Sequence, residues 1–112
     1  MIRIDAALDE AGLLLSCRVT GHAGAGPKGS DVVCAAVSVL TRTAFRTLSG
    51  REGITLRGGA PERGVFRMEA DYSGNGRDFL SGAGAFLIEG FTSVAELYPE
   101  FCELNIHRER RN

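Results

Sequence analysis

The sequence predicts a small α+β protein, a two-layer sandwich of ββαββαβ order with a mainly antiparallel sheet packed with two helices. Apolar and polar residues alternate in several short stretches, two longer stretches have helical spacing, and glycine-rich turns separate them. With 112 residues, the chain is long enough for a single domain, residues 1–112, and too short for two.

The first two strands are predicted at residues 2–8 and 13–20, on either side of a turn at residues 9–12. Apolar residues alternate with mostly polar ones in both, which is typical of a strand with one buried face. This pattern places Cys17 on the side of the core. The alternating apolar positions are Ile2, Ile4, Ala6, Leu8, Leu13, Leu15, Cys17 and Val19.

A helix is predicted after residues 21–29, GHAGAGPKG, because four glycines and a proline prevent regular structure in that segment. Ser30 is a favourable N-cap, and Asp31 supplies the negative charge that a first helical turn prefers. Ser49 and Gly50 end the helix. Its apolar positions are Val33, Val37, Leu40, Ala44 and Leu48.

A second hairpin is predicted from residues 54–57 and 65–72, with its turn at residues 58–61, GGAP. One face of its second strand carries Phe66, Met68 and Ala70.

The second helix is predicted to begin near Gly76 and to end before Pro99. A short last strand follows at residues 102–107. The helix has a nearly unbroken apolar stripe, which consists of Leu80, Ala83, Leu87, Phe91, Val94 and Tyr98.

Composition excludes several classes of protein. The net charge of -1 leaves no overall basic field with which a DNA-binding protein would hold a phosphate backbone. No stretch is apolar enough to span a membrane, and the N-terminus is charged where a signal peptide would be apolar. The three cysteines include no CxxC pair, which favours a reducing compartment. We expect a cytoplasmic protein that neither enters a membrane nor binds DNA directly.

Two patterns that would indicate a ligand are weak. A GxGxxG pattern lies in residues 24–29, but the predicted hairpins are not the parallel βαβ unit of a dinucleotide site. Cys17 and His22, like Cys102 and His107, have a C-x4-H spacing, but residues five apart on a strand point to opposite faces. We expect no metal and no cofactor.

The chemistry is concentrated in residues 21–40, GHAGAGPKGSDVVCAAVSVL. Cys34 falls at the end of the first helical turn, where free backbone N–H groups and the helix dipole stabilise a thiolate. His22 precedes the glycine-rich loop, which can return the imidazole to hydrogen-bond distance of the thiol. There the ring could take the thiol proton and later give it to a leaving amine. These residues indicate a Cys–His catalytic dyad.

Two further polar residues lie on the same helix face as Cys34. Asp31 precedes it by three residues, and Ser38 follows it by four. The thiol of Cys34 therefore has polar neighbours on the helical turns before and after it.

Simpler interpretations exist for each of these residues. Cys34 among Ala and Val is often an inert core residue, and His22 can be a loop histidine bonded to backbone. Asp31 can act only as a helix-start charge, and the Ser38 hydroxyl can bond back to the preceding turn. A different class is a non-catalytic phosphate-binding module that uses the glycine-rich loop and depends on Lys28. A purely structural dimerisation domain would need none of these side chains.

The segments GHA at 21–23 and GSDVVCAAVSVL at 29–40 resemble the signature of the ribosomal-processing cysteine protease Prp family, also called YsxB-like. The resemblance implies a small α/β fold, with His22 as general base and acid and Cys34 as nucleophile. It also implies that Asp31 and Ser38 are supporting polar residues of the site. The order of elements over the rest of the chain is compatible with that fold.

The same resemblance implies a dimeric endopeptidase that removes a short N-terminal extension from the twenty-seventh protein of the bacterial large ribosomal subunit. Its peptide substrate would be that N-terminal segment. Phe86 and Ile88 fall outside the apolar stripe of the second helix and are candidates for the homodimer surface. We interpret the charged residues 107–111 as a solvated tail, which could add local affinity for ribosomal RNA. The alternative to a peptidase is a non-catalytic protein that associates with the ribosome.

Overall fold

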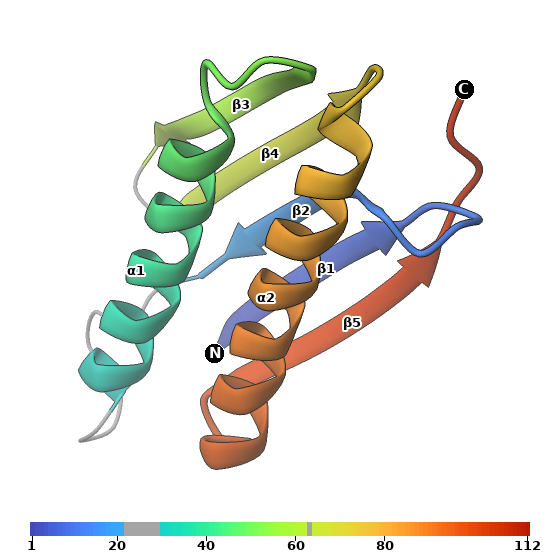
Figure 1. Cartoon of the computed structure of the whole chain (residues 1–112). Helices are drawn as coiled ribbons and strands as arrows, with labels where there is room; N and C mark the ends of the chain where they lie inside the picture. The colour runs from blue at the N-terminus through green and yellow to red at the C-terminus, as the bar shows by residue number, and fades with distance from the viewer. Residues whose placement is uncertain (22–29, 63) are drawn as a thin grey trace.

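The computed structural model describes residues 1–21, 30–62 and 64–112, except for the side chains of residues 30, 31, 61 and 62. Both helices cover the same face of one sheet (Figure 1). The elements follow in the predicted order, so the α+β sandwich is confirmed. They are β1 (Ile2–Leu8), β2 (Leu14–Thr20), α1 (Ser30–Leu48), β3 (Ile54–Glu62), β4 (Val65–Tyr72), α2 (Gly76–Leu97) and β5 (Cys102–Arg108).

The sheet has five strands in the order β3-β4-β2-β1-β5. Three pairs are antiparallel, β1 with β2, β2 with β4 and β3 with β4, and only β1 and β5 run parallel. The sheet is therefore mainly antiparallel, as the sequence predicts. β3 and β5 are its two edges, and α1 and α2 are the connections that lead to them.

The core lies between this sheet and the helix layer. Ile4 and Cys17 point inward from β1 and β2, with exposed fractions of 0% and 2%. Phe45 of α1 meets Phe66 of β4 edge to face, with ring centroids 6.2 Å apart, and so fastens α1 to the sheet. The helices bury most of their predicted stripes, namely Val33, Val37, Leu48, Leu80, Leu87, Phe91 and Val94.

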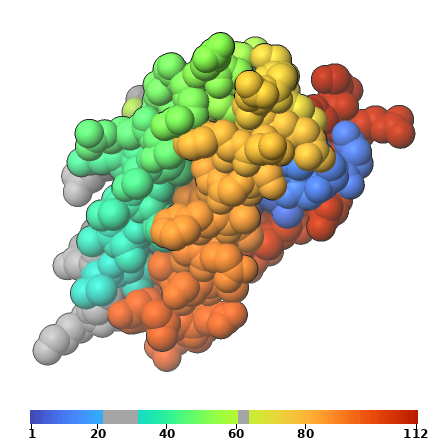
Figure 2. Space-filling model, in the orientation of Figure 1, coloured from blue at the N-terminus to red at the C-terminus, as the bar shows by residue number. Residues whose placement is uncertain are grey.

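The two helices lie side by side on this face (Figure 2). α2 ends at Leu97, two residues before Pro99, as the position of that proline predicts. Among the described residues, no helix combines the length and the apolar character that a membrane crossing requires.

A register shift changes the expected alternation at the start of β2. The irregularity lies between Ala7 and Leu8 of β1, where Leu8 pairs with Leu14. Leu14 is therefore buried, at 1% exposed, while Leu15 is only half-buried. The prediction that the side chain of Leu15 points into the core is wrong. The extra residue in β2 places the residues before it on the opposite face of the sheet from the one that strict alternation predicts.

The turn of the second hairpin lies farther along the chain than predicted. Residues 58–61 belong to β3, in which Gly58 and Gly59 pair with β4 although their φ angles are 123° and 149°. The prediction of a turn at residues 58–61 is therefore wrong. Glycines tolerate these angles within a strand, and Pro61 is acceptable because β3 is an edge strand.

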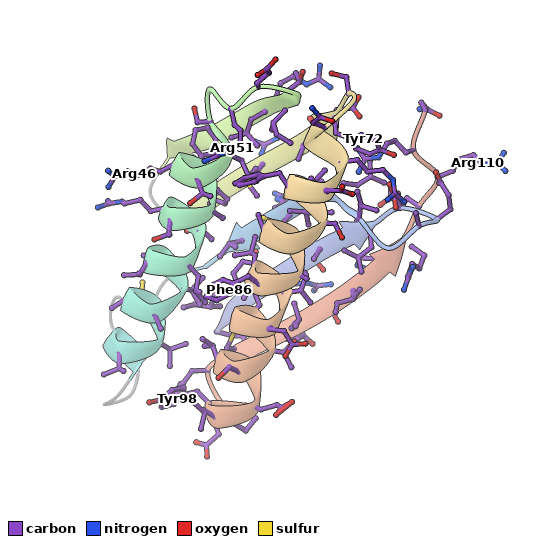
Figure 3. All side chains as sticks on the ribbon, in the orientation of Figure 1. Arg46, Arg51, Tyr72, Phe86, Tyr98 and Arg110 are labelled. Atoms are coloured by element: carbon purple, nitrogen blue, oxygen red, sulfur yellow. The ribbon has the colours of Figure 1, made fainter. Side chains whose placement is uncertain are left out.

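The C-terminal segment departs from the predicted solvated tail at Arg111. β5 continues through His107, and the side chain of Arg111 is only 9% exposed. The Nε atom of Arg111 donates a 2.8 Å hydrogen bond to the carboxylate of Asp9, which is 1% exposed. Arg110, in contrast, is exposed and points away from the sheet (Figure 3). Residues 107–110 are exposed, as the tail prediction expects, and the prediction is wrong only for Arg111, because the buried carboxylate of Asp9 binds this cation although the two are distant in sequence.

Candidate active site

Cys34 lies one turn into α1, as the fifth residue of that helix. Its side chain packs against the core but stays partly accessible, whereas the neighbouring Val33 is fully buried. The thiol therefore lies at the border of the buried stripe of α1. It is also next to the first helical turn, whose backbone N–H groups have no partner within the helix.

The three cysteines of the chain differ in their surroundings. Cys17 and Cys102 are 2% and 3% exposed, and burial raises the pKa of both thiols, that of Cys17 to about 12. A thiol in such surroundings stays protonated near neutral pH and is a poor nucleophile. Cys34 is the only one of the three that is not buried.

The supporting residues are described only in part. Ser38 is exposed, one turn after Cys34, and its carbonyl oxygen accepts a 3.1 Å hydrogen bond from the hydroxyl of Thr41. Asp31 belongs to the first turn of α1, but its side chain lies outside the description. The structure thus brings Cys34 and Ser38 to neighbouring turns of one helix.

His22 and Lys28 lie outside the described residues, together with the rest of residues 22–29. The predicted Cys–His pairing and the GxGxxG pattern fall on this segment. Both stay predictions.

Gly21 has a structural role that the sequence reasoning missed. Its φ angle is 94°, and a Cβ atom there would overlap the carbonyl oxygen of Met1. Its N–H group donates a 3.0 Å hydrogen bond to the carbonyl oxygen of Gly64, beside the β3–β4 turn. Only glycine fits this conformation without strain, so Gly21 sets where the chain leaves β2, immediately before His22. The sequence feature that could have predicted this role is the glycine at the start of the GHA segment, directly after a predicted strand.

The described residues contain no group of three His, Cys, Asp or Glu side chains that could hold a metal ion. Cys102 is buried, whereas His107 is exposed and its Nε2 atom lies 3.5 Å from Oδ1 of Asp5. This C-x4-H pair therefore points to opposite faces of β5, in agreement with the alternation of a strand.

The fold and the accessible cysteine on α1 are consistent with one class of enzyme, and comparison with known families identifies it: the protein is a cysteine protease. The family model described as "Cysteine protease Prp" matches residues 1–103. The chain belongs to this family. Its match covers all the described elements except the distal part of β5 and the residues after it.

Solved structures share the fold over nearly the whole chain. The SMU.848 protein of Streptococcus mutans has 30% identity and a TM-score of 0.79, and the match covers 97% of this chain and 96% of that one. The ribosomal processing protease Prp of Staphylococcus aureus in complex with a substrate peptide has 20% identity and a TM-score of 0.81, with coverages of 95% and 99%. The same protease with a covalently linked product peptide has 22% identity and a TM-score of 0.79, with the same coverages. A search of curated proteins found no match.

Proposed function

We propose that this protein is a cytoplasmic endopeptidase that removes a short N-terminal extension from the twenty-seventh protein of the bacterial large ribosomal subunit. The observation that carries the proposal is that Cys34 is accessible while Cys17 and Cys102, the other two cysteines, are buried. The chain belongs to a cysteine protease family, so the accessible thiol is the candidate nucleophile. The S. aureus structures, which hold substrate and product peptides of a ribosomal processing protease, support a peptide substrate of this origin.

In this mechanism the Sγ atom of Cys34 attacks the carbonyl carbon of the scissile peptide bond. His22 removes the thiol proton and returns it to the leaving amine, so that an acyl-enzyme remains. The oxyanion accepts hydrogen bonds from the free backbone N–H groups at the start of α1. His22 then takes a proton from a water molecule that attacks the acyl carbon, which releases the new carboxylate and restores the thiol. Asp31 and Ser38, on the turns before and after Cys34, support the site.

The substrate peptide is proposed to lie along β3. This strand is the sheet edge in contact with α1, the helix that carries Cys34, whereas the other edge, β5, packs against α2. The outer N–H and C=O groups of an edge strand can pair with an extended peptide, which then gains backbone hydrogen bonds irrespective of its side chains. Gly58 and Gly59 leave this part of the edge without side chains.

The proposal is tested by comparing Cys34→Ala with Cys17→Ala, a matched loss of one thiol. The substrate is a synthetic peptide that spans the N-terminal segment of the host's own ribosomal protein, and cleavage is followed by mass spectrometry. We expect Cys34→Ala to fold normally and to lose all cleavage, because a partly exposed thiol contributes little packing. Cys17→Ala should retain cleavage with a loss of about 1 kcal/mol in unfolding free energy. Cleavage by Cys34→Ala at the normal rate would exclude this nucleophile.

The role of His22 has a separate test. Replacement by Ala should move the pH dependence of Cys34 alkylation to higher pH, because the thiolate loses a neighbouring imidazolium. An unchanged alkylation profile would show that the two side chains are not coupled.

We also propose that the enzyme is a homodimer that associates through its helix layer. Phe86 and Val39 are 75% and 63% exposed, and both line an apolar groove of about 540 Å³ between α1 and α2. Phe86 lies on this side of α2 (Figure 3), whereas Ile88 is half-buried against the core. An exposed aromatic residue beside an apolar groove is a self-complementary surface for a second copy.

The dimer is tested by sedimentation of the Phe86→Asp variant, with Phe86→Leu as the control of similar polarity. The aspartate should produce a monomer and the leucine should leave the dimer in place. A monomeric wild-type protein, or a Phe86→Asp variant that is still dimeric, would contradict this surface.

A further inference from the structure

The face of the sheet opposite the helices carries a charged hollow. No helix covers this face in the described part of the chain (Figure 1). The hollow measures about 730 Å³ and lies over β2, β3 and β4. Among the described residues, its charged side chains are Arg18, Arg57, Arg67 and Glu69, so three guanidinium groups lie near one carboxylate in a chain whose net charge is -1.

Two of these arginines face each other directly. Arg18 of β2 and Arg67 of β4 are register partners in the antiparallel ladder, and both are exposed. Like charges at directly opposite positions destabilise a sheet. The pair is therefore unfavourable in the protein alone and becomes favourable when an anion lies between the two side chains.

The nearby carboxylates form no close ion pair with these arginines. Asp5, the partner of Arg18 in β1, lies 3.3 Å from the Nε atom of Arg3 and 3.5 Å from Nε2 of His107. In the described residues, neither Asp5 nor Glu69 forms an ion pair within 4.0 Å of an arginine of the hollow.

A glycine keeps the space beside these arginines open. Gly59 of β3 is the register partner of Arg67, and a Cβ atom at Gly59 would meet nothing within 4 Å. A side chain at this position would occupy the hollow. Its absence leaves room for a ligand next to the guanidinium group of Arg67.

We propose that this hollow, lined by Arg18, Arg57 and Arg67, binds the phosphodiester backbone of RNA. Each guanidinium group can form two parallel hydrogen bonds with a phosphate, and a phosphodiester chain presents one charge per nucleotide to successive arginines. The lining residues that the structure describes include no aromatic side chain on which a base could stack, so the contact reads the backbone and tolerates any sequence. The site goes beyond the proposed peptidase and would attach the enzyme to an RNA-containing particle.

The test measures the binding of a fluorescein-labelled RNA hairpin to the full chain by fluorescence anisotropy, between about 50 and about 200 mM salt. The test variant is Arg18→Gln/Arg67→Gln. The control variant, Arg46→Gln/Arg77→Gln, removes the same charge from two exposed arginines on the helices, of which Arg46 is labelled in Figure 3. Because the test variant removes a like-charge pair, we expect its thermal midpoint to equal or exceed that of the wild type.

Three phosphate contacts predict a slope of about −3 for the logarithm of the association constant against the logarithm of the salt concentration. The test variant should have a slope of about −1 and should lose about tenfold in affinity per arginine at the lowest salt. The control should retain both values. Equal losses in the two variants, or wild-type binding without salt dependence, would overturn the proposal.

A second measurement replaces the RNA with a short polyglutamate peptide. For a phosphate site we expect the peptide to bind weakly, and to bind the Arg18→Gln/Arg67→Gln variant as weakly as the wild type. Polyglutamate binding as tight as RNA binding would overturn the proposal in favour of an acidic protein partner. Cleavage of a short peptide should be unchanged in both variants, so the fate of this proposal is separate from that of the peptidase.

Discussion

The guanidinium group of Arg111 and the carboxylate of Asp9 form a buried ion pair between residues 102 positions apart, with 2.8 Å between Nε and Oδ2. The same guanidinium group donates to the carbonyl oxygens of Ala70 and Leu14, at 2.7 and 2.8 Å, and lies 5.0 Å from the ring centroid of Tyr72. One side chain thus joins the C-terminus to the β1–β2 turn and to the end of β4. Arg111 lies beyond residues 1–103, the region that the family model matches, whereas its partners lie within that region. We call this set of contacts of Arg111 the latch.

Loss of Arg111 should therefore destabilise the protein strongly. Arg111→Ala leaves the carboxylate of Asp9 buried without its cation, and we expect a loss of about 3 kcal/mol in the free energy of unfolding. Urea denaturation measures this loss, and Arg110→Ala is the matched control, with an expected change within about 0.5 kcal/mol. Equal stabilities of the two variants would show that the latch contributes nothing.

The acid stability of the protein should depend on Asp9. Burial by itself raises the pKa of this carboxyl group. The hydrogen bond from Arg111 and those from the backbone N–H groups of Leu13 and Ala11 outweigh burial and hold the pKa below its ordinary value. The unfolded chain therefore binds this proton more readily. The resulting stability is present above about pH 4 and is lost as the pH falls through the lowered pKa.

Urea midpoints at a series of pH values below neutrality test this dependence. Asp9→Asn should start from a lower stability and lose less of it on acidification than the wild type. Asp78→Asn, which alters an exposed carboxylate on α2, should follow the wild-type curve. If the urea midpoints of the wild type and of Asp9→Asn fell in parallel with pH, the acid dependence could not be assigned to Asp9.

At alkaline pH the buried thiol of Cys17 should limit stability. Burial raises its pKa to about 12, so the folded state holds this proton more tightly than the unfolded chain does. Its contribution is complete below the ordinary thiol pKa, about 8.5, and is lost as the pH rises toward 12. Thermal midpoints should fall less steeply above pH 9 in Cys17→Ala than in Cys34→Ala. The same slope in both variants would argue against this cause.

Two glycine substitutions should have opposite effects on stability. Gly58 has a φ of 123°, and a Cβ atom would overlap the carbonyl oxygen of Arg67, so Gly58→Ala should cost about 1–3 kcal/mol. Gly82 lies in the middle of α2 with open space around it, so Gly82→Ala should add about 1 kcal/mol through helix propensity. Calorimetry of both variants distinguishes them, and a Gly58→Ala protein as stable as the wild type would exclude strain at this edge.

Local patterns were sufficient to predict the elements of this fold. Alternation in β1 and helical spacing in α2 report which face of each element is apolar, and apolar faces must meet in a core. The order of elements, the buried position of Cys17 and the place of Cys34 near the start of α1 all follow from residues close in sequence. The family resemblance also rests on contiguous residues, 21–40.

Contacts between distant residues were decided only in the tertiary structure. The glycines of β3 favour a turn when considered alone, but pairing with β4 keeps them in the strand. Arg111 has the sequence context of a solvated tail, yet its side chain is largely buried in an ion pair with Asp9, because a buried carboxylate requires a partner. The opposition of Arg18 and Arg67 depends on the register between β2 and β4. Sequence periodicity determines which face of an element is apolar, whereas the folded chain alone determines which charges become neighbours.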